Sequence, residues 1–230
     1  QNITQVITPV MHPIFSEYQN DLERLASGYE RIVRFLAFIG LPLSVLLYFT
    51  AGEVTLILFG DQWMPSIPIF RILTLSVGIQ IVLSSSGSIF QAAGDTKSLF
   101  VCGLFSSVLN VAGILLGIFR IGTLQAVATC ITLTFTVNFV QCYWMMYRVT
   151  LHRSLRHFAV QLVSPLAVSV LLIAVLYPLS LLTEGGNIFL TLIVKSIIFF
   201  CIFGCYIQLT GEYDIIGKAK GILNKRKSRG

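Results

Sequence analysis

Six long runs of apolar residues constrain this chain more than any other feature of its sequence. A helix needs about 20 apolar residues to cross roughly 30 Å of hydrocarbon. A membrane β-barrel would instead show alternating apolar and polar residues over about 10 positions, and these runs are too long and too uniformly apolar for that. We therefore predict an all-α integral membrane protein with six transmembrane helices, at residues 35–52, 65–93, 98–119, 121–147, 158–183 and 187–209.

The composition excludes several classes of protein. Only 11% of the 230 residues are charged, whereas a soluble domain has about 25%, so a soluble enzyme, a secreted disulfide scaffold and a disordered tail are ruled out. The sequence contains no P-loop, GxGxxG, HExxH or GxSxG pattern. Its five cysteines and three histidines form no ligand pattern. We expect no catalytic residue, no metal and no cofactor.

The lysines and arginines indicate the orientation of the chain. The net charge is +6, and the positive charge lies in short gaps between the apolar runs rather than on a folded surface that could bind nucleic acid. Alternate gaps hold thirteen of the sixteen basic residues on one side of the membrane and one on the other. Because cytoplasmic loops carry the excess of Lys and Arg, both ends of this chain are predicted to be cytoplasmic.

Two segments outside the six spans have their own character. Apolar residues recur every three or four positions over residues 15–35, with charges on the other face. This pattern predicts an amphipathic helix on the cytoplasmic membrane surface, or a connecting helix with one solvated face. Residues 211–230 form a basic tail, which sets the topology and could touch anionic lipid head groups.

Polar and small residues form stripes along three of the predicted spans. Membrane helices associate through small residues and interhelical hydrogen bonds, so each stripe indicates either simple helix packing or one wall of a polar cavity. The stripes consist of Ser76, Gln80, Ser84, Gly87 and Gln91; of Gly103, Ser106, Asn110, Gly113 and Gly117; and of Thr134, Asn138 and Gln141.

Two cations lie within spans. Arg71 is in the second span and Lys195 in the sixth. A cation at the centre of a membrane helix costs roughly 2.5–3.5 kcal/mol on insertion scales, which makes each a candidate contact for a substrate. Snorkelling to the interface or a local structural ion pair is the alternative. No carboxylate lies inside a predicted span, and the acids Glu53, Asp61 and Asp95 lie at their rims.

The order of several short motifs resembles a known family. The motifs are Thr8–Ser16, Tyr29-Glu30-Arg31, Leu41-Pro42-Leu43, Phe59-Gly60-Asp61-Gln62-Trp63, Ile69–Leu73 and Gln91–Thr96, followed by a span that bears Asn110. With these motifs the chain resembles, over roughly Asn2 to Arg148, bacterial polysaccharide flippases of the Wzx type. These belong to the multidrug/oligosaccharidyl-lipid/polysaccharide exporter superfamily, and the resemblance is strongest to the colanic-acid and lipopolysaccharide exporter branch.

The resemblance implies part of a two-lobe bundle. Residues 1–34 would end one span and connect to the next, residues 35–149 would form four helices of the C-terminal lobe, and residues 150–210 would add two more. The chain begins with Gln1 rather than Met. We therefore expect a C-terminal fragment whose partner is the missing N-terminal lobe.

The implied function is the flipping of a polyprenyl-diphosphate-linked oligosaccharide across the bacterial inner membrane by alternating access. Membrane lipids and the polysaccharide polymerase machinery are further expected partners. The amides and cations predicted to line the transport cavity are Gln80, Gln91, Asn110, Asn138, Arg71 and Lys195.

Two alternatives remain open at this point. A multidrug or small-molecule exporter of the same superfamily would be expected to carry an intramembrane acid, which this chain lacks within its predicted spans. A membrane enzyme acting on polyprenyl-linked sugars would need catalytic acids, histidines or arginines in its outer loops. Those predicted loops are short and offer Glu53, Asp61, Arg120 and Glu184.

Overall fold

The structure is a computed structural model that describes residues 22–183 and 185–210. Six helical segments in the described part are long and apolar enough to cross a membrane, which confirms the six predicted spans and the all-α class. The helices are α2 (Leu22–Phe59), α3 (Ile67–Leu83), α4 (Ser86–Ala92), α5 (Thr96–Leu116), α6 (Leu124–Met145), α7 (Leu155–Leu182) and α8 (Ile188–Thr210), with a 3-10 helix η1 (Asp61–Ser66) and π-helical turns η2 (Gly117–Ile121) and η3 (Met146–Thr150).

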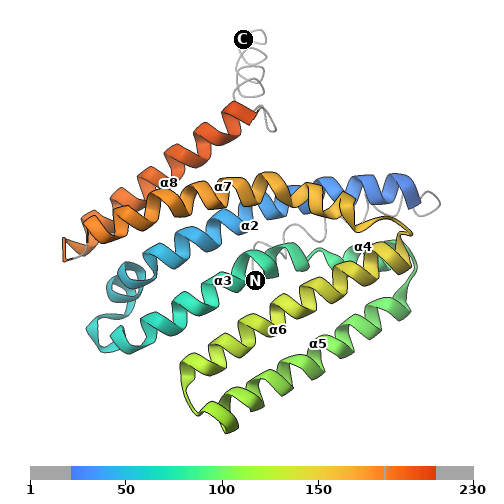
Figure 1. Ribbon diagram of the computed structural model, residues 1–230, viewed down its shortest axis with the longest axis horizontal. Coiled ribbons are helices and arrows are strands. Elements are labelled where there is room, and N and C mark those ends of the chain that lie inside the picture. The colour runs from blue at the N-terminus through green and yellow to red at the C-terminus, as the bar shows by residue number, and fades with distance from the viewer. Residues whose placement is uncertain (1–21, 184, 211–230) are drawn as a thin grey trace, which may run out of the picture.

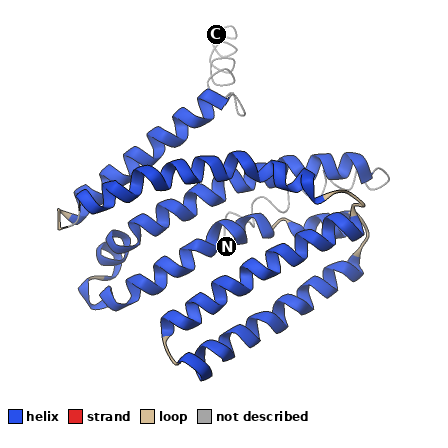
Figure 2. Cartoon of the chain, viewed as in Figure 1, coloured by secondary structure: helices blue, strands red, loops and turns tan. Residues whose placement is uncertain are grey.

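The long helices lie in a row, and α2 is near its middle. Figure 1 shows α7 and α3 on either side of α2, with α6 and then α5 beyond α3. Helix α8 contacts both α7 and α2. Figure 2 shows that only short loops join them. At one end of the row α2 begins, α4 meets α5, and η3 leads to α7; we call this the basic end because Arg148, Arg153 and Arg156 lie there. The other end, with the turns at Gly60, Gly122 and Gly185, is called the Gly60 end.

Local sequence explains where the helices turn. Gly60 and Gly122 have φ values of 83° and 72°, which residues with a Cβ rarely adopt. Asp95 precedes α5 and accepts a hydrogen bond from the Ser98 amide at 3.0 Å. Thr123 caps α6 in the same way, because a side-chain oxygen satisfies an amide that the first turn leaves without a partner.

Two spans differ from their predicted form. The first was expected at 35–52, but α2 runs unbroken over 38 residues, or about 57 Å at 1.5 Å per residue. The separate surface helix over 15–35 is not confirmed, because residues 22–34 continue directly into the span and bury Tyr29 and Val33 in the core. Residues 15–21 of that prediction and the basic tail at 211–230 lie outside the described residues.

The second span is interrupted rather than continuous. Ser84 and Ser85 separate α3 from α4. The Ser85 hydroxyl, buried among α2 and α6, lies 3.1 Å from the Tyr29 hydroxyl, which is itself 3.0 Å from the Tyr143 hydroxyl. A break in a membrane helix is tolerated where protein groups satisfy the freed backbone, and here Tyr143 donates to the Val82 carbonyl at 3.0 Å.

Small residues set the closest helix contacts. A Cβ added to Gly78 of α3 would lie 2.8 Å from the Gly40 carbonyl oxygen of α2. Gly117, the last residue of the predicted stripe in the third span, packs likewise, since a Cβ at this position would lie 2.8 Å from the Val127 backbone of α6. These glycines therefore let neighbouring backbones touch. Close contact of this kind is expected in a membrane, because lipid is as apolar as leucine and burying leucine between helices adds little stability.

Candidate functional site

A cavity of about 410 Å³ opens at the Gly60 end, between α2, α3, α7 and α8. Its described lining residues include both membrane cations that the sequence singled out, Arg71 and Lys195, and one carboxylate, Glu53. Hydroxyl groups and the glycine turn between α7 and α8 complete the polar part of its wall. The lining residues used in the arguments below are Gly52, Glu53, Arg71, Tyr177, Thr191 and Lys195.

Lys195 is a buried cation held by α2. Its ammonium forms an ion pair with the Glu53 carboxylate and donates to the Phe49 carbonyl oxygen at 2.9 Å. The two charged side chains are only 5% and 13% exposed. A buried ammonium without a counter-ion would be strongly unfavourable, so Glu53 is the group that allows Lys195 to stay inside the helix row. The pair also joins α8 to α2.

Arg71, in contrast, is exposed. Its guanidinium has no hydrogen-bond or ion-pair partner among the described residues. A Cβ on Gly52 would lie 3.9 Å from Arg71 Nη2. The guanidinium therefore lies over Gly52, the residue directly before Glu53 in α2. It is a cation available to a ligand.

The four predicted amides do not join this cavity. Asn138 is buried and lines a second pocket of about 180 Å³ between α4, α5 and α6. Its Oδ1 has no hydrogen-bond partner within residues 22–183 and 185–210. Asn110 accepts a hydrogen bond at 2.8 Å from Thr134, which ties α5 to α6. Gln80 and Gln91 are exposed, and Gln80 donates to the Ser76 hydroxyl at 2.8 Å.

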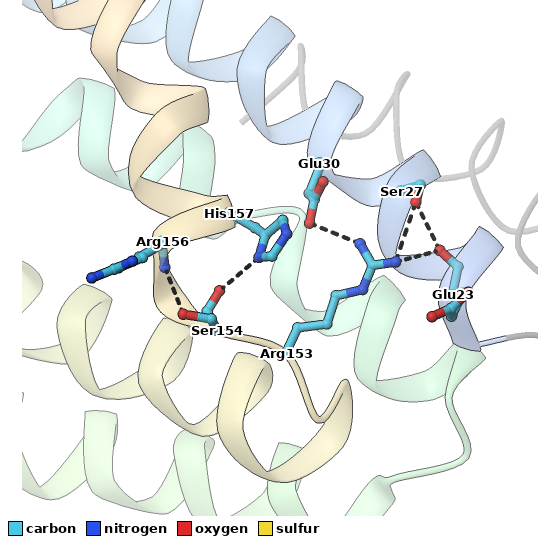
Figure 3. Close-up of polar contacts among 7 residues, drawn as sticks. All are labelled: Glu23, Ser27, Glu30, Arg153, Ser154, Arg156 and His157. Atoms are coloured by element: carbon cyan, nitrogen blue, oxygen red, sulfur yellow. Dashed lines mark hydrogen bonds and ion pairs between the residues drawn. The ribbon is translucent and has the colours of Figure 1, made fainter.

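A polar network at the basic end fixes the start of α2, as Figure 3 shows. The Arg153 guanidinium forms an ion pair with Glu30 at 3.2 Å and also donates to the Glu23 carbonyl oxygen at 3.3 Å and to the Ser27 hydroxyl. Since Arg153 and Glu30 are 123 residues apart in the chain, local sequence patterns gave no signal for this contact.

Asp95 links two loops at the same end. Its carboxylate accepts from the Thr150 hydroxyl at 2.7 Å while it caps α5. Burial by itself would raise the pKa of Asp95, but the hydrogen bonds from Ser98 and Thr150 outweigh it, and the pKa lies below its usual value. The ionised form is the one that these donors stabilise.

Sequence reasoning placed Glu53 at the rim and missed its role. The signal was present, since a buried lysine requires a counter-ion and Glu53 is an acid at the end of a neighbouring span. What the sequence lacked was the knowledge that α8 packs on α2. The structure thus brings Arg71 and Lys195 together and adds Glu53 between their helices.

Comparison with known proteins is consistent with this architecture. Residues 1–68 match a family described as "Polysaccharide biosynthesis protein". The lipopolysaccharide biosynthesis protein WzxC of Escherichia coli is 25% identical over 80% of this chain and 37% of its own length. The teichuronic acid biosynthesis protein TuaB of Bacillus subtilis is 25% identical over 63% of this chain and 30% of its own length.

The chain resembles proteins that are named for polysaccharide biosynthesis and transport. A third relative, the succinoglycan biosynthesis transport protein ExoT of Rhizobium meliloti, is 24% identical over 64% of this chain and 30% of its own length. The solved structure of the lipid II flippase MurJ, in an inward closed conformation, matches 89% of this chain and 42% of its own chain with a TM-score of 0.68 at 14% identity. That likeness shows a shared fold. The six long apolar helices of the described residues make this chain a multi-pass membrane protein. It spans well under half the length of these relatives.

Proposed function

We propose that this chain is part of an exporter that flips a polyprenyl-diphosphate-linked oligosaccharide from the cytoplasmic to the periplasmic leaflet of a bacterial inner membrane. The observation that carries the proposal is the meeting of Arg71 and Lys195 in one cavity, in a chain whose relatives are named for polysaccharide biosynthesis. Arginine and lysine side chains bind phosphate groups through charge-assisted hydrogen bonds. Flipping makes no covalent bond, so no catalytic residue is required.

Alternating access supplies the mechanism. A second helical lobe of the same exporter rocks against this one and exposes the polar cavity to each side in turn. The exposed amides Gln80 and Gln91 meet sugar hydroxyls in the completed exporter, and the Asn138 side chain offers an acceptor that no described residue uses. Asn110 serves helix packing, since its side chain already bonds Thr134.

The orientation follows from the charges. The basic end faces the cytoplasm, because cytoplasmic loops carry the excess of Lys and Arg. Both ends of this chain are then cytoplasmic, and the cavity with Arg71 opens toward the periplasm. This places the cations where a diphosphate arrives after crossing rather than where it enters.

Deletion of the gene in its host tests the proposal. We expect loss of a surface polysaccharide together with accumulation of the intact lipid-linked oligosaccharide in the inner membrane. Restoring the gene reverses both effects, and restoring it with Arg71→Gln reverses them only in part. A changed chemical composition of the lipid-linked pool would indicate an enzyme instead. Unchanged polysaccharide with increased drug sensitivity would indicate a multidrug exporter.

A further inference from the structure

The charges around the cavity at the Gly60 end are unequal. Its described lining contains two cations, Arg71 and Lys195, and one carboxylate, Glu53. None of the other described lining residues is a lysine, arginine, histidine, aspartate or glutamate. This lining therefore carries one net positive charge.

We infer that this cavity binds an anionic phosphate-ester group on Arg71, and that Glu53 acts as an internal counter-ion that competes with the ligand for Lys195. The inference rests on the proposed function and adds a site and a competitor to it. Arg71 has no polar partner among the described residues, so it accepts the first negative charge directly. Lys195 is already neutralised by Glu53, so it contributes only when a second negative charge draws it away.

The geometry supports this division of labour. Glu53 pairs with Lys195 of α8, and the residue next to it on α2, Gly52, faces Arg71 of α3, whose Nη2 would lie 3.9 Å from a Cβ at that glycine. An anion on Arg71 therefore approaches the Glu53 carboxylate, and the two negative charges repel each other. Thr191, one turn before Lys195 on α8, lines the same cavity. Its hydroxyl is a neutral donor that does not alter the balance of charge.

The competition makes an unusual prediction. Removing a carboxylate that pairs with a buried lysine normally weakens a protein and does nothing for its ligands. Here the change Glu53→Gln removes the competitor but keeps an amide oxygen that can accept from the ammonium. Binding of a diphosphate should therefore become tighter, whereas Arg71→Gln should weaken it. A purely structural ion pair would not produce opposite effects from these two substitutions.

The experiment measures the dissociation constants of inorganic diphosphate and of farnesyl diphosphate for the purified chain in detergent, by isothermal titration calorimetry. Farnesol is the uncharged control ligand. The matched protein control is Arg120→Gln, which removes an exposed arginine at the same end of the row but outside the cavity. Arg71→Gln replaces an exposed side chain without a described partner, so this variant should fold even if Glu53→Gln does not.

We expect the dissociation constant to rise about tenfold in Arg71→Gln, because one charged hydrogen bond to the ligand is lost. We expect it to fall about tenfold in Glu53→Gln, because the competing carboxylate is removed. Arg120→Gln should match the unchanged chain, and farnesol should not bind. Equal affinity for the two diphosphates would identify a soluble anion as the occupant, whereas tighter binding of farnesyl diphosphate would identify a lipid head group. Either result supports a phosphate site.

The inference is overturned if neither diphosphate binds, if Arg71→Gln changes nothing, or if Glu53→Gln weakens binding. When Glu53→Gln cannot be purified, Glu53→Asp tests the same point, because the shorter side chain draws the carboxylate back from Lys195 and should also tighten binding. Failure of the proposed function is a separate outcome: the diphosphates would bind as described while the deletion left the surface polysaccharide unchanged.

Discussion

Substituting Gly78 by alanine should separate the two central helices of the row. The added Cβ would lie 2.8 Å from the Gly40 carbonyl oxygen and 3.0 Å from Leu41 Cα. Both are backbone atoms that cannot rotate away, so α3 must shift and strain its bond to Ser44, whose hydroxyl accepts from the Gly78 amide. Overpacking of this kind destabilises a protein by about 1–3 kcal/mol. Replacing a helical glycine by alanine stabilises the helix by about 0.5–1 kcal/mol, which offsets part of that loss.

The net loss of unfolding free energy for Gly78→Ala is therefore about 1–2 kcal/mol, or about 2–8 °C in melting temperature for a chain of this size. The assay heats the chain in detergent and measures the fraction that remains monodisperse by size-exclusion chromatography. The control is Gly103→Ala in α5, where a Cβ would meet nothing within 4 Å, and its stability should stay equal or rise. Equal stability of Gly78→Ala and Gly103→Ala would refute the proposed backbone contact.

Three further substitutions test other contacts. Lys195→Met leaves the buried Glu53 carboxylate without its counter-ion and should lower the unfolding free energy by about 3–5 kcal/mol. The double substitution Lys195→Met with Glu53→Gln should restore most of this loss. Thermal unfolding of the two single variants and the double variant checks this. Arg153→Gln should raise amide exchange in the first turns of α2 about tenfold, whereas Arg156→Gln, which removes an exposed side chain, should leave it unchanged. The pKa of Asp95 is lowered in the folded chain, so its carboxylate stabilises the fold above about pH 4, and this stabilisation is lost as the pH falls below that value. Asp95→Asn should therefore be less stable than the unchanged chain at pH 7. A pH series of melting temperatures should show that Asp95→Asn has lost this part of the acid dependence.

The number and order of the spans could be predicted from the sequence because hydrophobic length alone decides them. The third span shows how far such reasoning extends. Its small residues indicated a contact face, and Gly113 and Gly117 do pack on α6. The choice between packing and a cavity could not be made in advance, since the partner of Asn110 is Thr134 on another helix.

The candidate site needed information that no local pattern carries. Arg71 and Lys195 are 124 positions apart, and they share a cavity only because α2 packs against both α3 and α8. The same packing moves Glu53 from a predicted rim position to a buried ion pair. The four predicted amides lie outside this cavity for a related reason. Their stripes were regular along each helix, but the row of helices turns them toward different neighbours or leaves them exposed.

Reconstitution of the exporter that contains this chain tests the account most directly. Proteoliposomes are loaded with a fluorescently labelled polyprenyl-diphosphate-linked oligosaccharide, and a membrane-impermeant quencher reports which leaflet holds the label. The account predicts movement of the intact lipid-linked molecule between leaflets, slowed by Arg71→Gln and unaffected by Arg120→Gln. Movement no faster than in protein-free vesicles, or release of the label as free glycan, would contradict it.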